Sequence, residues 1–192
     1  MRCIPHIHGT SWEVFSNTEK TINNEINSIS DNPLIFPNGS IRNSGHFHAE
    51  PVAQALDSLS VAISEIGAIS ERRIHFFMKG ADNKLPMFGA INGGLESGFM
   101  LAHVTAASLA SENKTLAHPS SVDSLSTSAG QEDIVSMAPW AGRSCLRILD
   151  NVRMILAIEL LVAGNINHRF HHQLNSSDGL QSLMKLLKKL EK

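Results

Sequence analysis

The sequence predicts an all-α protein built from long helices, and three observations support this prediction. Apolar residues recur every three or four positions over long stretches, as they do along one face of a helix. Pro51 and Pro119 stand where two of these stretches begin and end. No segment is a convincing strand, because sustained alternation of apolar and polar residues is absent from the sequence.

The strongest helical pattern runs from Pro51 to Phe77. Its apolar residues are spaced alternately four and three apart, at Val52, Leu56, Leu59, Ile63, Ile66 and Ile69. This spacing is nearly that of a heptad repeat. We therefore expect a long partner helix alongside it at a shallow angle.

Two more long helices are expected at 97–116 and 141–163. The first has a stripe of Met100, Val104, Ala107 and Ser111, and a second stripe of the small residues Ala102, Ala106 and Ala110. Small residues let helix backbones approach closely, so we expect burial on several sides. The second becomes apolar nearly all round, which predicts that neighbouring helices or other subunits cover it.

Weaker signals flank these helices. Residues 8–29 predict a helix that ends before Pro33, and 32–45 predict a loop rich in Pro, Asn, Ser and Gly. The tail at 178–192 predicts a basic amphipathic helix. We favour an ordinary edge helix over a membrane-surface or calmodulin-binding element, because Lys near a helix C-terminus is favoured by the helix dipole.

Composition excludes several classes of protein. The chain has 192 residues, 42% hydrophobic and 18% charged, which is typical of one globular domain with a core. A net charge of -2 gives no electrostatic reason to expect nucleic acid. The most apolar run, 154–163, is shorter than the roughly 20 residues of a membrane span. Two Cys and no secretory leader predict free thiols and a cytoplasmic location.

Three polar clusters are candidates for chemistry. They are Arg2 with 5–9, residues 45–50, and the loop at 120–133, each at the edge of a helix, where side chains can converge on a cleft. Two His-x-His pairs and His168, His171 and His172 fit no metal-ligand spacing, so we expect no metal. The serines of the loop lack a nucleophile-elbow motif, which favours capping and loop hydrogen bonds. Glu71-Arg72-Arg73 is typical of an intrahelical or subunit ion pair.

Read in order, many segments resemble the C-terminal part of the histidine ammonia-lyases, which belong to the aromatic amino acid lyases. The segments that carry this resemblance are Arg2-Cys3 with Pro5 and Gly9, 27–33, 45–50, 70–73, 97–100, 105–107, 111–114, 118–129, Gln131-Glu132-Asp133 and 135–137. The similarity spans about residues 1 to 164, so we treat 1–192 as a single all-α region with a divergent tail at 165–192. Gln-Glu-Asp resembles histidine enzymes more than phenylalanine or tyrosine ones.

The resemblance implies a long-helix bundle of the lyase and fumarase-like type that assembles as a homotetramer. It implies the elimination of ammonia from L-histidine to give trans-urocanate, a reaction of histidine catabolism. The implied cofactor is methylidene-imidazolone (MIO), which forms from an Ala-Ser-Gly loop and captures the substrate before the β-proton and ammonia leave. This chain contains neither Ala-Ser-Gly nor any Tyr.

Five residues receive roles from the resemblance. Arg2 would pair with the substrate carboxylate, which suits a guanidinium fork. Phe47 would pack near cofactor and substrate, and Met100 would line the side-chain pocket. Glu132 would face the imidazole or transfer a proton, with Gln131 supporting it. The catalytic residues are thus expected to be Arg2 and Glu132.

The chain also differs from the usual family pattern. The family usually has Gln where this chain has His6, Asn in place of His46 and of Gly130, and His in place of Ile134. His46 lies beside the expected cofactor region. The tail at 165–173 keeps a basic character but loses the usual Arg-Pro-Leu.

Three hypotheses follow. The first is a split or truncated histidine ammonia-lyase that needs an N-terminal lyase part from another chain and is inactive alone. Its exposed apolar helix faces would make it associate. The second is a catalytically inactive remnant, or a regulatory subunit within a lyase tetramer. The third, a fumarase-type relative, ranks last because the Ser-rich signature loop of those enzymes is absent.

Overall fold

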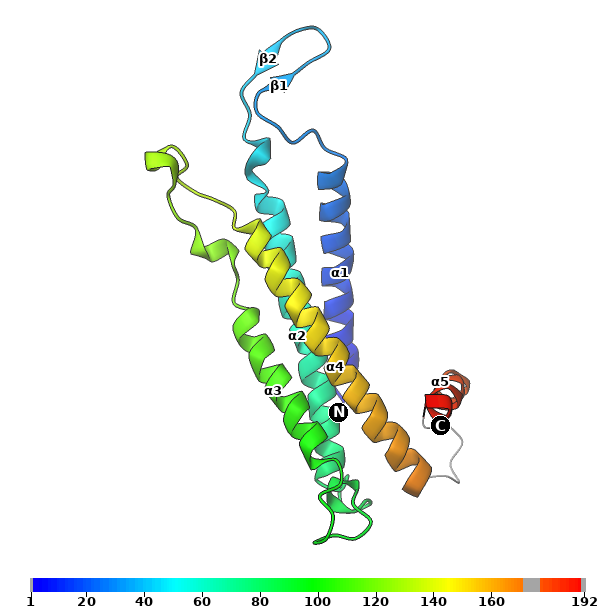
Figure 1. Ribbon diagram of the computed structural model, residues 1–192. Helices are drawn as coiled ribbons and strands as arrows, with labels where there is room; N and C mark the ends of the chain where they lie inside the picture. Colours follow the sequence, from blue (N-terminus) through cyan, green and yellow to red (C-terminus); the bar gives the residue numbers. More distant parts are fainter. Residues whose placement is uncertain (1, 171–176, 191–192) are drawn as a thin grey trace. The chain divides into compact units, whose positions relative to one another are not determined.

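A computed structural model describes residues 2–170 and 177–190, which are mostly helical (Figure 1). The helices are α1 Ile4–Ile26, α2 Glu50–Met78, α3 Met100–Leu116, α4 Ala138–Phe170 and α5 Asp178–Leu190. Single 3-10 turns are η1 His46–His48, η2 Met87–Gly89, η3 Ser121–Asp123 and η4 Ser128–Gly130. Two short strands, β1 Leu34–Ile35 and β2 Ile41–Arg42, pair antiparallel. The predicted all-α fold with long helices is confirmed.

The chain divides into two compact units, and the division crosses three helices. The first unit is Met1–Gly67 with Ser111–Val152, and the second is Ala68–Ala110 with Arg153–Lys192. Helices α2, α3 and α4 therefore each contribute a segment to both units.

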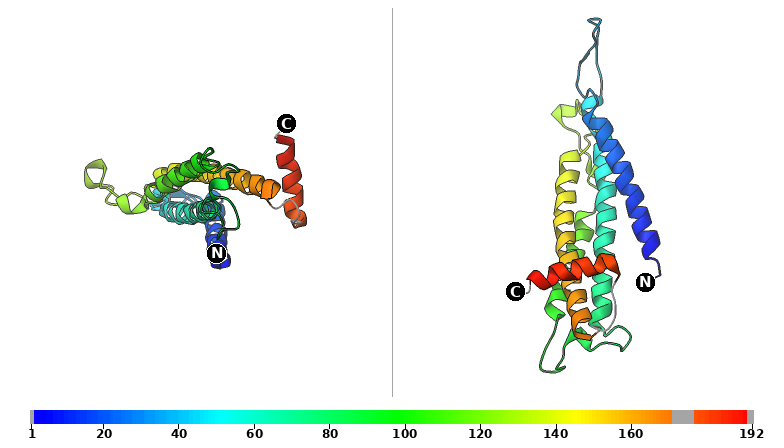
Figure 2. Two further views of the ribbon diagram at one scale, coloured as in Figure 1. Left: turned by 90° about the horizontal axis from the view of Figure 1, so that it is seen from below. Right: turned by 90° about the vertical axis from the view of Figure 1, so that its right-hand side faces the viewer.

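In the first unit, α1 and the early part of α2 run antiparallel (Figure 2). The Ser11 hydroxyl donates to the Ala62 carbonyl at 3.5 Å, and the Thr18 hydroxyl to the Ala55 carbonyl at 3.2 Å. The core beside them contains Ile63, Cys145, Ile148 and Val152, with Phe15, Leu59, Ile66, Leu116 and Leu149 packed against it. The predicted apolar face of α2 thus supplies three of these residues.

In the second unit, segments of α2, α3 and α4 surround an apolar core. The core consists of Ile74, Met78, Ala81, Leu85, Ala106, Ala110, Ile155, Ile158, Val162 and Ile166.

Charged and polar side chains also join these helices. The Arg73 guanidinium donates to Glu159, and this hydrogen bond raises the pKa of Arg73. The Ser70 hydroxyl donates to the same carboxylate at 2.6 Å. Glu71, only 3% exposed, contacts Arg72 and lies 3.0 Å from the His103 ring nitrogen.

Several element boundaries differ from the predicted ones. Helix α1 begins at Ile4 rather than near residue 8, because Pro5 is compatible with a first helical turn. Helix α3 begins three residues later than predicted, and α4 extends from 138 to 170. The predicted loop at 32–45 holds the β1–β2 hairpin, whose strands have two residues each and are too short for sequence periodicity to reveal.

The prediction that α3 is buried on several sides is wrong for this chain. Its stripe of small residues is buried as expected, with Ala106 0% exposed and Ala110 9% exposed. Leu101 and Val104 lie on the uncovered side of the helix and are exposed. Within α4, Leu146, Met154 and Leu161 are exposed too. These apolar surfaces agree with the expectation of uncovered helix faces, and whether they cause association stays a prediction.

The stretch His46–Met78 passes a test of length and composition for a membrane-spanning helix. Core helices of soluble proteins pass the same test, and this stretch supplies residues to both cores.

Gly98 fixes the entry into α3. Its φ is +50°, and a Cβ at this position would overlap the carbonyl oxygen of Phe88. That carbonyl accepts a hydrogen bond from the Phe99 N–H at 2.9 Å. Gly98 therefore meets both a conformational and a steric requirement for glycine.

We predict that Gly98→Ala lowers the free energy of unfolding by about 2–4 kcal/mol. The new methyl group would overlap the Phe88 carbonyl oxygen, and alanine is unfavourable in this left-handed backbone conformation. Urea denaturation followed by circular dichroism measures this change. Gly93→Ala is the control, because no atom lies within 4 Å of its Cβ position and its φ is not in the left-handed range. Equal denaturation midpoints for the two variants would contradict the prediction.

Candidate functional site

The loop between α3 and α4, residues 117–137, is anchored at its start by Asp57 of α2. The two oxygens of this carboxylate accept hydrogen bonds from the backbone N–H groups of Ser120 at 3.0 Å and Ser121 at 2.8 Å. Asp57 is only 7% exposed. A buried carboxylate needs such donors, so these bonds fix the direction in which the loop leaves α3.

The loop carries Glu132 at the close of a tight turn. Thr127 and Glu132 exchange backbone hydrogen bonds at 2.9 and 3.3 Å. Between them Ser128, Ala129 and Gly130 have φ values of +53°, +58° and +87°. Left-handed non-glycine residues are uncommon and cluster at functional sites. Glu132 is half-buried there, and its neighbour Gln131 is exposed.

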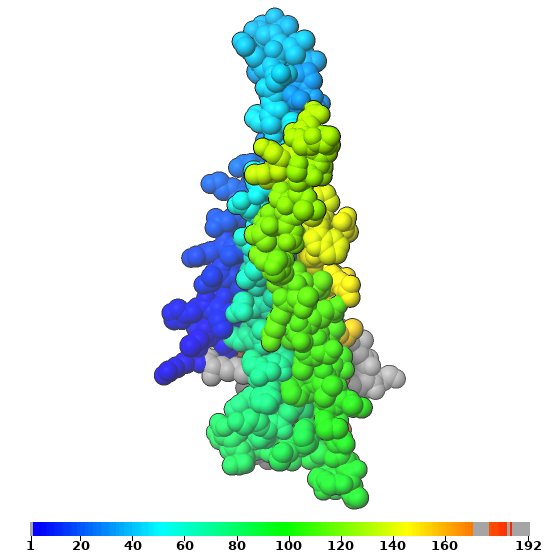
Figure 3. Space-filling view, turned by 90° about the vertical axis from the view of Figure 1, so that its left-hand side faces the viewer, coloured from blue at the N-terminus to red at the C-terminus, as the bar shows by residue number. Residues whose placement is uncertain are grey.

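Phe47 lies on η1, directly before α2, and is 50% exposed. Ala49, with φ +58°, redirects the chain into the helix. Nε2 of His48 lies 2.8 Å from the carbonyl oxygen of Ile134, which joins η1 to the loop that carries Glu132. In the space-filling view the yellow-green loop lies against the cyan segment (Figure 3). The second and third predicted clusters therefore meet.

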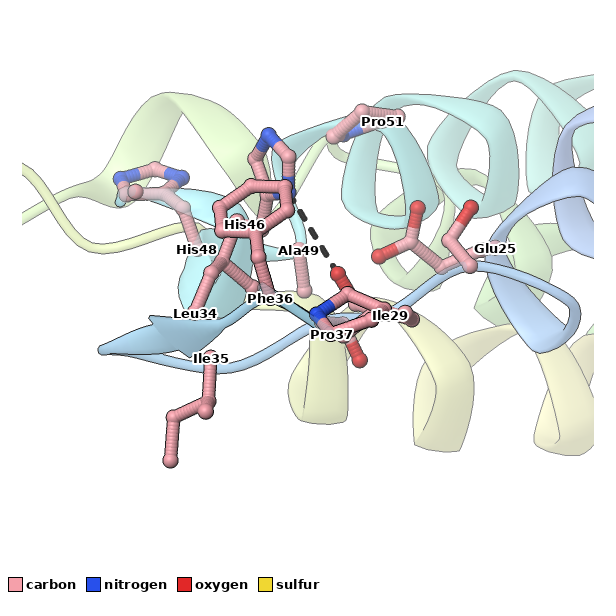
Figure 4. A pocket seen from close by; sticks show the side chains of 13 residues that line it. Glu25, Ile29, Leu34, Ile35, Phe36, Pro37, His46, His48, Ala49 and Pro51 are labelled. Carbon is pink, nitrogen blue, oxygen red and sulfur yellow. Dashed lines mark hydrogen bonds between the residues drawn. The ribbon is translucent and has the colours of Figure 1, made fainter. Parts of the chain in front are cut away.

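Beside this junction is a cavity of about 650 Å³ between the end of α1, the hairpin and η1 (Figure 4). Its lining is mostly apolar, with a few polar groups: Glu25, Ser28, Ile29, Ser30, Leu34, Ile35, Phe36, Pro37, Gly45, His46, His48, Ala49 and Pro51. Nδ1 of His46 lies 3.4 Å from the Ile29 carbonyl oxygen, and Ile35 points away from the other side chains. A concave apolar surface with few polar groups is typical of a small-molecule site.

Arg2 does not join this group within one chain, and its part in the site stays a prediction. Arg2 is exposed and precedes α1, whereas η1 lies at the far end of that helix, where it shares a cavity with Glu25 and contacts the loop at 117–137 (Figure 1). The 23 residues of α1 separate them. At 1.5 Å per residue this is about 35 Å, far beyond the reach of an arginine side chain.

Met100 lies in the second unit, as the first residue of α3. It is 37% exposed and lines a separate cavity of about 380 Å³ formed by the segment 86–97. Its relation to Phe47 and Glu132 stays a prediction.

The remaining candidates have structural roles or none in the described residues. No group of three His, Cys, Asp or Glu side chains in 2–170 and 177–190 could hold a metal. His168 is exposed, whereas His171 and His172 lie outside the described residues. Cys3 and Cys145 are free, and burial raises the pKa of the Cys145 thiol, which makes it less reactive. The serines form loop hydrogen bonds, as the Ser124 hydroxyl does with the Val135 N–H.

The sequence did not predict the structural roles of Asp57 and His48. Asp57 lies outside the predicted apolar stripe of α2, so the sequence carries no signal for its buried contact with the loop. His48 belongs to the predicted cluster at 45–50 and to a His-x-His pair, and neither pattern predicts its contact with Ile134.

Comparisons with known proteins agree with the family resemblance of the sequence. The family model for aromatic amino acid lyases matches residues 1–189. A histidine ammonia-lyase of Aliivibrio fischeri strain MJ11 is 51% identical over 189 residues, which are 98% of this chain and 37% of that protein.

Two solved structures match as well. The histidine ammonia-lyase of Trypanosoma cruzi has a TM-score of 0.92 at 43% identity, and the Pantoea agglomerans phenylalanine aminomutase has 0.93 at 33%. Each alignment covers 98% of this chain and 37% of the other. The chain thus spans little more than a third of the length of these relatives. On the match of its sequence and its fold, the chain belongs to the aromatic amino acid lyase family.

Proposed function

We propose that these residues form part of a histidine ammonia-lyase, which eliminates ammonia from L-histidine to give trans-urocanate. The observation that carries the proposal is the junction of the Phe47 turn with the strained loop that bears Gln131 and Glu132. Identity of 51% to a histidine ammonia-lyase, against 33% to a phenylalanine aminomutase, supports histidine as the substrate.

Four residues of this chain have roles in the proposed reaction. The C–N bond breaks and a C=C bond forms as a proton leaves the β-carbon and ammonia departs. The Glu132 carboxylate is suited to bind the substrate imidazole N–H or to move a proton, with the amide of Gln131 beside it. The Phe47 ring offers a half-exposed apolar surface for the substrate. Arg2 would hold the substrate carboxylate with two parallel hydrogen bonds.

These residues need more than one copy to form a site. Arg2 lies about one α1 length from Glu132, roughly 35 Å, so one chain cannot bring both to the same substrate. We therefore propose a homo-oligomer in which Arg2 comes from another copy. The exposed apolar residues of α3 and α4 supply surface for such contacts.

The cofactor would come from residues outside this sequence, which lacks the Ala-Ser-Gly from which MIO forms. Phe47 fits such a group, since its half-exposed aromatic ring can pack against a planar partner. When bound, MIO supplies the electrophile that captures the substrate. The residues of this chain would then bind the substrate, orient it and take up a proton from it.

A second candidate function is a non-catalytic subunit of a lyase assembly. The observation that favours it is His46, at a position where the family usually has Asn. Such a subunit would use the same exposed helix faces to associate.

We predict no urocanate from L-histidine with this chain alone, and urocanate after mixing with an N-terminal lyase part that carries Ala-Ser-Gly. Urocanate absorbance measures the product, and light scattering shows assembly. Assembly without product would contradict the catalytic proposal and support the non-catalytic subunit.

In an active assembly, we predict that Glu132→Gln lowers kcat/KM for L-histidine by about 10²–10⁴, because it removes a group that binds or transfers a proton. Asp133→Asn is a matched control. Its side chain is exposed, and its Oδ1 can still accept the Ile134 N–H, so the change should stay within about twofold. Equal losses in the two variants would count against a specific role for Glu132.

A further inference from the structure

His48 links two parts of the chain that are 86 residues apart. Its Nε2 lies 2.8 Å from the Ile134 carbonyl oxygen. A carbonyl oxygen only accepts hydrogen bonds, so Nε2 carries the proton and donates it. One side of this link is the turn with Phe47, and the other is two residues beyond Glu132.

The other hydrogen bonds of the loop do not reach η1 in the described residues. Asp57 holds residues 120 and 121, near the start of the loop. The Thr127–Glu132 backbone pair and the bond from the Val135 N–H to the Ser124 hydroxyl join residues within the loop itself. Neither type of contact sets where the tip at 127–134 lies relative to Phe47. The hydrogen bond of His48 does.

Glu50, the first residue of α2, faces the other nitrogen of the ring. Its Oε2 is buried, lacks a hydrogen-bond partner in the described residues, and lies 3.8 Å from Nδ1 of His48. Its Oε1 accepts a hydrogen bond from the Gln54 amide at 2.9 Å. The carboxylate is thus held from behind on the Nδ1 side of the imidazole, at a separation beyond hydrogen-bond range.

We propose that His48 is a positioning residue that holds the loop carrying Gln131 and Glu132 against the turn carrying Phe47. This inference rests on the proposed function for its effect on turnover. The structural part stands without it, because the link exists whether or not the chain takes part in catalysis.

Hydrogen exchange on the chain itself tests the structural part. We expect His48→Ala to speed exchange of the Thr127, Glu132 and Val135 amides about tenfold, since loss of one hydrogen bond lets the tip open. Exchange in α1 and α2 should stay unchanged, which shows that the unit is folded. His48→Gln keeps an N–H donor and should restore most protection.

His118→Ala is the control, because that histidine is exposed and makes no side-chain hydrogen bond in the described residues. Equal exchange in His48→Ala and the wild type would overturn the proposal.

Kinetics in an assembly that forms urocanate tests the effect on turnover. We expect His48→Ala to lower kcat about tenfold while KM for L-histidine changes less, because Arg2 still binds the carboxylate. His48→Gln should recover most of kcat. A loss that His48→Gln does not recover would overturn positioning through the donated hydrogen bond. If no assembly forms urocanate, the proposed function fails, and the hydrogen-exchange result still decides the link.

Discussion

The Asp57 carboxylate is the contact on which the arrangement of the candidate site depends. It lies within a helix whose apolar neighbours build the core, yet it is kept buried by two backbone N–H groups at the start of the loop. Hydrogen bonds to an ionised carboxylate contribute about 1.5–3 kcal/mol each. Because α2 also begins directly after Phe47 and His48, one helix sets the position of both the turn and the loop that meet at its end.

The helices that position the site are only partly covered. In each unit, one face of the helices packs into a core, as Ile148 and Val152 do in the first unit and Ile155 and Val162 do in the second. Other faces leave Leu101, Val104 and Leu146 exposed. Large apolar side chains gathered on helix surfaces are typical of interfaces. The uncovered surface and the separation of Arg2 from Glu132 both favour a site that several chains complete.

Sequence periodicity predicted the helices well because burial of one face imposes it. The bounds of α2 were within one residue at each end, since Pro51 marks its start and its apolar spacing persists to Phe77. The β1–β2 hairpin was missed, because two-residue strands carry no period. For the site, the resemblance assigned roles to Phe47 and Glu132, and the structure joins the segments that carry them through His48 and Ile134. Contacts such as His48 with Ile134 or Asp57 with Ser120 span 86 and 63 residues, and no local pattern encodes them.

A segment exchange tests the central claim most directly. The aligned 189 residues of this chain would replace the matched segment of the Aliivibrio fischeri histidine ammonia-lyase, to which they are 51% identical, and urocanate formation would be measured. If the chain supplies a working share of a histidine ammonia-lyase site, the hybrid should keep kcat/KM within about tenfold of the parent. A hybrid that folds and assembles like the parent but forms no urocanate would contradict the account.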